Sequence, residues 1–350
     1  MESTSSSLRV EPLKAAHLTW LHANDQAALL PKLQILLLRG WLAQAENLVP
    51  GLLISRQPFA LVASEQHQLC SLLMIRPHNR QATCWRLELQ ALVPPIGHGQ
   101  AHVNRELLKL ALLGAHARSR SWVVRSSSGD LAQLGVLREL GFQPIRTMRR
   151  WRAPGQAQSQ AQVRPALPKG LAWVEIDRQT TPLLWHLDQA STTSHQRQIV
   201  DRHPTDLLDQ AGPGTGVLLA TRPDPTAAEA NVAIAGLIRQ QRCDDAHVFE
   251  LLREPAWDQR IDQALPILLN QLRRQFAQAT LVCSQEDVEL AQRIDALGWQ
   301  PLEDEFLLGR SLWRRQSAPR LLQGTRPLET MLGHLQPQQP PLPTPSLGRR

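Results

Sequence analysis

The sequence has no tyrosine, few lysines and few cysteines. The lack of tyrosine and the scatter of the cysteines each exclude a kind of chemistry. Without tyrosine, no phenol can act as an acid, a base or a nucleophile. The four cysteines are dispersed, without a CxxC pair or a zinc-type spacing, which excludes the common structural zinc modules. We expect these thiols to be reduced and buried, as in a cytoplasmic protein.

Long apolar runs are also missing. The most apolar stretch, Ile35–Leu38, is closed by Arg39, whereas a membrane span needs roughly 18 uninterrupted apolar residues. The first residues show no basic region followed by an apolar one, so no secretory signal is expected. The sequence therefore predicts no contact with a membrane.

Positive charge is abundant, and nearly all of it is arginine. The net charge is +7 and the pI is about 10.0, yet only four of the 38 basic residues are lysine. Dense basic runs are confined to Arg149–Arg152, Arg273–Arg274 and Arg314–Arg315. A nucleic-acid partner would need the arginines to gather on one face, so their scatter does not favour one. The phosphates of a nucleotide cofactor are the alternative anion.

Two domains suit a chain of 350 residues, because a domain usually holds about 100 to 200. A stretch rich in Gln, Ala and Pro divides the chain near its middle, and prolines crowd its C-terminal end. The predicted divisions are a disordered N-terminus at 1–7, a first domain at 8–153, a linker at 154–169, a second domain at 170–316 and a disordered tail at 317–350.

The two halves repeat one another. Trp122–Pro144 and Thr280–Pro301 both run from a strand-like segment through a polar turn and a short helix to Gly-aromatic-Gln-Pro. In the first of them, we expect one serine of Ser126–Ser128 to cap the helix. The tryptophans lie mostly on apolar stretches, which predicts core packing rather than stacking on bases.

The elements upstream of this repeat also follow the same order in the two halves. Apolar periodicity predicts two N-terminal helices, and then three strands and a helix in each half. The expected elements are helices Leu13–Asn24 and Leu33–Gln44; strands Phe59–Ser64, Leu69–Ile75 and Trp85–Val93 before a helix at Val103–Gly114; and strands Gly216–Thr221, Val232–Ile238 and His247–Leu252 before a helix at Ile267–Phe276. This order predicts an α/β fold in which helices flank a mixed, largely antiparallel sheet.

The ordered set of elements resembles the GNAT superfamily of N-acetyltransferases over Leu8–Arg152 and again over Gly170–Arg315. Leu140-Gly141-Phe142 and Leu297-Gly298-Trp299 stand where that family often has Leu-Gly-Phe. The resemblance implies two tandem GNAT-like acyl-CoA N-acyltransferase domains, with acetyl-CoA as co-substrate and a small-molecule or protein amine as acceptor.

In that family a Gln/Arg-x-x-Gly-x-Gly/Ala turn opens the central helix, and its backbone N–H groups hold the pyrophosphate of CoA. Gly97-His98-Gly99 matches the two glycines, with Pro94 in the Gln/Arg position. A plain strand-to-helix turn is the alternative for so short a motif. The cofactor contacts that the resemblance implies are Val93, Gly97, His98, Gly99, Gln100 and Ala101.

The second half departs further from the family pattern. Its corresponding stretch, Glu254–Asp262, has no glycine and contains three carboxylates, whose charge opposes phosphate binding. Pro266 is expected to restrict how the following helix starts. The sequence therefore predicts a degenerate second domain that packs against the first or covers the substrate.

The residues that could carry acyl transfer are few. The resemblance implies a tyrosine acid on the short helix before Leu-Gly-Phe, but Leu137 and Ile294 stand at about those positions. Glu88, on the strand that leads to Val93, is the candidate catalytic base. Its alternative role is a solvent-facing residue or an ion pair with Arg86.

A metal site is not predicted. His98, His102 and Glu106 are spaced four residues apart, which would align them on one face of a helix. The helix is expected to begin after His98, however, and this breaks the geometry.

Two functions remain open from the sequence. The leading interpretation is an acyl-CoA-dependent N-acyltransferase that uses the first domain for the cofactor and the cleft between domains for the amine. The alternative is a catalytically inactive GNAT-like module that binds a ligand or a protein. Gly97 and Gly99 favour the enzyme, whereas the missing tyrosine and the altered second half favour the module.

Overall fold

The computed structural model describes residues 7–21, 29–46, 57–114, 119–154, 166–222, 230–240 and 247–311. These residues belong to one compact unit, Met1–Leu312. Most of the predicted linker, the whole predicted tail and Cys243 lie outside the described residues. Within the described part of the chain, no helix has the length and apolar character needed to cross a membrane.

The first half opens with a short strand and a 3-10 helix. Its elements are β1 (Arg9–Pro12), η1 (Ala15–Trp20), α1 (Leu30–Glu46), β2 (Phe59–Glu65), β3 (Gln68–Pro77), β4 (Cys84–Ala91), α2 (Gln100–Leu113), β5 (Ser121–Ser127), α3 (Leu131–Glu139) and β6 (Gln143–Arg152). The helix predicted at Leu13–Asn24 is present as the shorter 3-10 helix η1, and residues 22–24 lie outside the described residues. The backbone N–H of Leu13 donates to the carbonyl of Ala60 at 2.9 Å, which ties this segment to the sheet.

The second half repeats the plan with extra helices near its start. Its elements are β7 (Leu171–Val174), α4 (Thr181–Ser191), α5 (Ser194–Val200), α6 (Pro204–Leu208), β8 (Gly216–Arg222), β9 (Ala230–Gln240), β10 (Val248–Arg253), α7 (Arg260–Gln275), β11 (Thr280–Ser284), α8 (Val288–Ala296), β12 (Gln300–Pro301) and β13 (Glu305–Ser311). Helix α7 starts before Pro266, so the expectation that this proline limits the start is wrong. A buried stripe that includes Ile261, Leu265 and Leu268 stabilises the helix on both sides of the proline.

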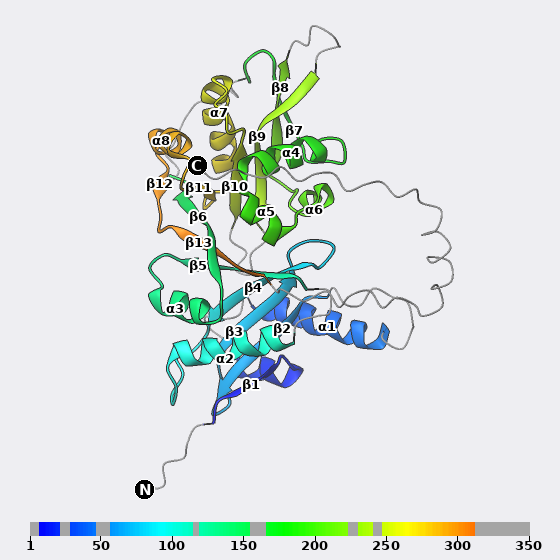
Figure 1. Ribbon diagram of the computed structural model, residues 1–350, viewed down its shortest axis with the longest axis vertical. Helices are drawn as coiled ribbons and strands as arrows, with labels where there is room; N and C mark the ends of the chain where they lie inside the picture. Colours follow the sequence, from blue (N-terminus) through cyan, green and yellow to red (C-terminus); the bar gives the residue numbers. More distant parts are fainter. Residues whose placement is uncertain are drawn as a thin grey trace, which may run out of the picture. The chain divides into compact units, whose positions relative to one another are not determined.

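The described strands form a single sheet in the order β1-β2-β3-β4-β5-β13-β6-β11-β10-β9-β8-β7, with β12 also paired to β6 (Figure 1). Each half contributes one parallel pair, β4 with β5 and β10 with β11, and the other pairs are antiparallel. Helix α2 connects the first parallel pair and α7 connects the second. The predicted α/β fold with a mixed, largely antiparallel sheet is confirmed.

The final strands of the two halves are exchanged. Strand β13 of the second half lies between β5 and β6 of the first, and β6 extends to pair with β11 (Figure 1). Leu308 of β13 is consequently buried in the first core, and Trp151 of β6 in the second. Neither half completes its sheet or its core without a strand of the other.

Helix α3 and its counterpart α8 begin with the same kind of cap and end with the same kind of glycine turn. Asp130 and Asp287 cap them by accepting hydrogen bonds from the backbone N–H groups three residues later, so the predicted serine cap is wrong. Both helices are followed by a glycine with positive φ, Gly141 at +80° and Gly298 at +79°. These glycines leave the helix in the left-handed conformation that L-residues avoid. The aromatic residue after each one is buried.

Three cysteines are free and buried as predicted, namely Cys70, Cys84 and Cys283. Burial raises the pKa of the Cys84 thiol to about 12 and that of the Cys283 thiol to about 11. The tryptophans of the first parallel pair, Trp85 and Trp122, are buried in the core under α2 and α3. Core packing is therefore confirmed for these two.

Candidate functional site

The parallel strands β4 and β5 diverge part-way along their length. Their pairing covers Cys84–Leu87 and Ser121–Val124 and then stops, although β4 continues to Ala91 and β5 to Ser127. Helix α2 begins at Gln100, after the loop that follows β4. The N-terminus of α2, which carries a partial positive charge, thus follows the diverging end of β4 after a short loop.

The predicted cofactor residues surround this helix start. Val93 is half-buried two residues beyond the end of β4, and Gly97 and His98 precede the helix. Gly99 is the N-cap residue with φ −72°, and a β-carbon built there would meet no other atom within 4 Å. The space around Gly99 therefore permits a close approach by a ligand without requiring one.

Gln100 and Ala101 form the first turn of α2. The side chain of Gln100 points back to the protein, where its Nε2 donates to the Ser71 hydroxyl at 2.6 Å and to Asn104 Oδ1 at 2.8 Å. Within the described residues, no acceptor is found for the backbone N–H groups of Gly99, Gln100 and Ala101. These three donors fit an anionic group at the helix N-terminus.

A carboxylate that the sequence did not single out holds the rest of the turn. Glu65, at the end of β2, accepts from the backbone N–H of Ile96 at 2.7 Å and of Gly97 at 2.9 Å. His98 Nδ1 lies 2.5 Å from its other oxygen. Burial alone raises the pKa of Glu65, but the N–H groups of Gly97 and Ile96 and the imidazole of His98 outweigh it and lower the pKa.

The fixed charge of Glu65 limits what the turn can bind. The Glu65 side chain is fully buried, and it uses three donors that a phosphate would otherwise engage. An anion at this turn is therefore left with the N–H groups of the first helical turn, near a like charge. His102 stacks on His98 at 5.2 Å between ring centroids, which leaves the imidazoles side by side rather than around a metal.

Glu88 lies where the two strands begin to diverge, one residue beyond the last paired residue Leu87. Arg76 Nη2 donates to its Oε2 at 3.0 Å, and Arg86 Nη1 donates to its Oε1 at 3.4 Å. Both carboxylate oxygens are therefore engaged by guanidinium groups. The flanking Leu87 and Leu89 pack in the core under α2, so Glu88 belongs to the opposite face of the sheet.

That opposite face carries a cavity of about 610 Å³ between the two halves. Its walls come from α1, β2, β3 and β4 of the first half, and from α6 and β9 of the second. Arg76 and Arg86, the partners of Glu88, both line it. The cavity therefore lies on the face of the sheet that carries Glu88.

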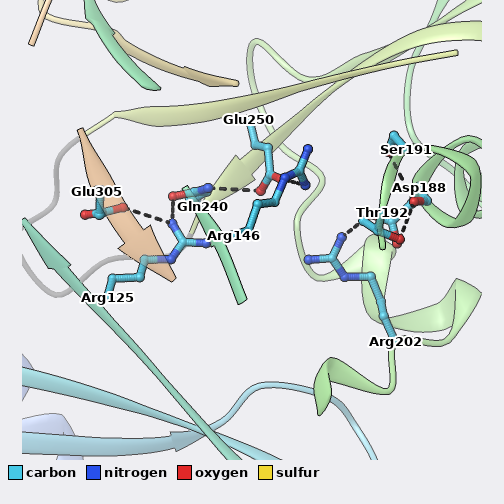
Figure 2. A network of polar contacts seen from close by, with 9 residues as sticks. All are labelled: Arg125, Arg146, Asp188, Ser191, Thr192, Arg202, Gln240, Glu250 and Glu305. Atoms are coloured by element: carbon cyan, nitrogen blue, oxygen red, sulfur yellow. Dashed lines mark hydrogen bonds and ion pairs between the residues drawn. The ribbon is translucent and has the colours of Figure 1, made fainter. Parts of the chain in front are cut away.

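A buried polar network joins the halves beside the opening (Figure 2). Arg125, directly after the last paired residue of β5, donates to the Gln240 side chain, whose Nε2 in turn donates to Glu250 at 2.9 Å. Glu250 also lies 3.7 Å from Arg146, and Arg125 lies 3.7 Å from Glu305. Burial raises the pKa of Glu250, but the guanidinium groups of Arg146, Arg202 and Arg125 outweigh it and lower the pKa.

The corresponding opening of the second half is filled. Strand β10 pairs with β11 only as far as Glu250, and Arg253 then makes two short hydrogen bonds to Asp287, at 2.6 and 2.7 Å. The guanidinium also stacks on Trp257, 4.8 Å from the ring. A small cavity of about 10 Å³, lined by apolar residues and Arg253, lies beside it. The backbone N–H of Arg260 donates to Asp258, so a carboxylate also lies at the start of α7.

Neither position at which the family resemblance implies a tyrosine acid carries an acidic side chain. Leu137 on α3 and Ile294 on α8 are completely buried in the two cores. Of the residues singled out from the sequence, the structure brings Gly97–Ala101 together at one helix start and places Glu88 at the strand opening. Glu65 was missed because a glutamate in a polar hairpin is normally exposed.

Comparison with known proteins concerns the fold. No family model matches the sequence, and no curated protein matches it. A solved Drosophila protein is 14% identical over 85% of this chain and 97% of its own, with a TM-score of 0.50. A GCN5-related N-acetyltransferase from Sphaerobacter thermophilus is 12% identical over 89% of this chain and 98% of its own, with a TM-score of 0.49. A tandem GNAT protein of clavulanic acid biosynthesis is 13% identical over 89% of this chain and 100% of its own, with a TM-score of 0.42.

The mixed, largely antiparallel sheet with flanking helices is the one that the resemblance in the sequence implied. The chain has a GNAT-type fold. At these identities the likeness to solved structures does not extend to substrates or to catalytic residues.

Proposed function

We propose that the protein is an acyl-CoA-dependent N-acyltransferase that uses acetyl-CoA and acts through its first half. The observation that supports this most directly is the contrast between the two GNAT-type openings. In the first half, three N–H groups at the start of α2 have no acceptor among the described residues, whereas in the second half Asp258 accepts at the start of α7 and Arg253 binds Asp287 beyond the end of the β10–β11 pairing. One helix start with free N–H donors and one with a carboxylate fit a single cofactor site in the first half.

The residues of the first half fit parts of an acyl-CoA ligand. The N–H groups of Gly99, Gln100 and Ala101 would donate to its pyrophosphate, and the free space around Gly99 allows that approach. Glu65 opposes the fit by its charge, so we expect moderate rather than tight binding.

Acyl transfer needs a base that accepts the proton of the attacking amine. Bound acetyl-CoA supplies a thioester carbonyl that an amine can attack. Glu88 is the carboxylate beside the strand opening, and we assign it to receive the proton of the amine. Because Arg76 and Arg86 stabilise its anionic form, its contribution is expected at the low end for acid-base catalysis, about 100-fold. Water protonates the leaving thiolate.

Titration calorimetry with acetyl-CoA tests the cofactor assignment. Gly99→Trp fills the space above the helix start and is expected to weaken binding at least about tenfold, because it excludes the phosphates. Gly135→Trp is the matched control, because Gly135 is an exposed residue of α3 that also has nothing within 4 Å of its β-carbon position. Equal binding by wild type and Gly99→Trp would contradict the proposal, as would no binding by the wild type.

The alternative function is a GNAT-type module without catalysis. Two observations favour it: Glu65 engages the phosphate turn from within the protein, and no tyrosine acid is present. A protein that binds acetyl-CoA but shows no acetyl-CoA hydrolysis or transfer with any amine would support this alternative.

A further inference from the structure

Two neighbouring hollows lie between helix α7 and β7, the strand at one end of the sheet order. One has a volume of about 690 Å³ and the other of about 590 Å³. We call them together the α7 site, because four residues line both, namely Trp173, Leu268, Gln271 and Gln275. The α7 site belongs to the second half and contains none of the residues assigned above to the cofactor or to acyl transfer.

Trp173 gives the α7 site an aromatic surface. Its partner across the β7–β8 pair, Leu218, is buried in the core under α7, so the indole lies on the α7 face of the sheet. A β-carbon on Gly216 would lie 2.8 Å from the indole Nε1 and closer still to two ring carbons. The ring therefore covers Gly216 and needs a glycine there. The indole is only partly buried, and it lines both hollows.

Amide side chains of α7 surround this indole. Gln271 and Gln275 are about one helical turn apart and line both hollows, and Asn270 lines the smaller one. All three side chains are exposed, and none of them makes a hydrogen bond among the described residues. An amide both donates and accepts hydrogen bonds, as a hydroxyl group does. The wall is therefore suited to a ligand that carries several hydroxyl groups.

The α7 site has no net charge. Among the described residues that line it, the charged ones are a single carboxylate, Glu175, and a single guanidinium, Arg274. An anion or a cation would thus meet one attractive and one repulsive charge. The chain as a whole has a net charge of +7, so this neutral balance distinguishes the site from the rest of the molecule. A neutral ligand fits it better than an ion.

We propose that the α7 site binds a neutral carbohydrate. The apolar face of one pyranose ring packs on Trp173, and the hydroxyl groups of the sugar exchange hydrogen bonds with the amides of Gln271 and Gln275. Hollows of about 590 and 690 Å³ have room for a small sugar. This binding lies beyond the proposed acyl transfer and does not depend on it.

Ligand-observed NMR of the full chain, without acetyl-CoA, measures the binding. Saturation-transfer spectra are recorded with maltose, cellobiose and N,N′-diacetylchitobiose, which differ in linkage and substituents, and with choline as an organic cation. We expect saturation to reach the ring protons of at least one disaccharide and not to reach choline. No transfer to any of the three disaccharides overturns the proposal. Transfer to choline alone also overturns it, because Trp173 and Glu175 would then form a cation site.

Variants then locate the sugar. Trp173→Ala is expected to weaken binding at least about tenfold, because the aromatic surface is lost. Trp173 also packs against the core under α7, so the exposed Gln271→Ala and Gln275→Ala are used as well. Each should weaken binding about fivefold, the effect of one lost hydrogen bond.

Gln263→Ala is the matched control. It makes the same change at an exposed position of α7 that lies outside both hollows, and it should leave the affinity for the disaccharide unchanged. Unchanged affinity in Trp173→Ala and in both glutamine variants contradicts the assignment of the sugar to this site. An equal loss in Gln263→Ala and in the two glutamine variants contradicts it too.

Discussion

Replacement of Glu65 by alanine tests the buried carboxylate at the turn before α2. The carboxylate accepts from two backbone N–H groups and contacts His98. Each hydrogen bond to a charged group contributes about 1.5–3 kcal/mol. Ile96 and Gly97 are exposed, so their freed N–H groups can bind water, which reduces the loss. We expect the free energy of unfolding to fall by about 2–4 kcal/mol.

Urea unfolding followed by circular dichroism measures this change. Glu139→Ala is the control, because Glu139 forms a surface ion pair with Arg105 and its removal should change the free energy of unfolding by less than about 1 kcal/mol. Hydrogen exchange gives a local reading: the amides of Ile96 and Gly97 should exchange faster in Glu65→Ala and not in the control.

The pH dependence of this effect has a definite sign. The folded pKa of Glu65 is lowered, so its contribution is complete above the unfolded value of about 4.3 and is lost as the pH falls through the folded value. The stability difference between wild type and Glu65→Ala should therefore be constant from pH 6 to pH 8. It should shrink below about pH 4. A difference that grows with acidity, or a loss under about 1 kcal/mol at pH 7, would refute the reasoning.

Two further predictions each compare a pair of positions. Asp287→Ala removes both a helix cap and the ion pair with Arg253, and it should lower the free energy of unfolding by about 3 kcal/mol. Asp130→Ala removes only a cap, and it should lower the free energy of unfolding by about 1 kcal/mol. Equal losses in urea unfolding would contradict the assigned pair. Gly141→Ala should cost about 1–2 kcal/mol because its φ is +80°, whereas Gly135→Ala within α3 should stabilise by about 0.5–1 kcal/mol. Thermal unfolding of both variants checks the opposite signs.

The repeat was predictable because its signals are local. A strand, a polar turn, a short helix and a glycine stop depend on neighbouring residues, so both copies could be recognised and aligned. The capping residue was assigned wrongly within a span of a few residues, because serine and aspartate are about equally good caps. The helix predicted at Leu13–Asn24 starts later, as the 3-10 helix η1, because a backbone hydrogen bond from Leu13 to Ala60 of β2 ties the start of that segment to the sheet.

Strand exchange could not be read from the sequence. The apolar alternation of β6 and β13 predicts that each is a strand with one buried face, but it does not name the neighbour. Pairing β13 with β5 joins residues that lie far apart in the chain, and only the folded sheet decides between partners of similar character.

The sequence by itself determined the α/β repeat, the glycine turn before α2 and the loss of that turn in the second half. Tertiary structure alone decided that Glu65 holds the turn, that Arg253 and Asp287 fill the second opening, and that residues from both halves line one cavity. The physical reason is that a charged side chain in a sequence is exposed by default. Its partner, which decides whether it is buried, is supplied by another part of the chain.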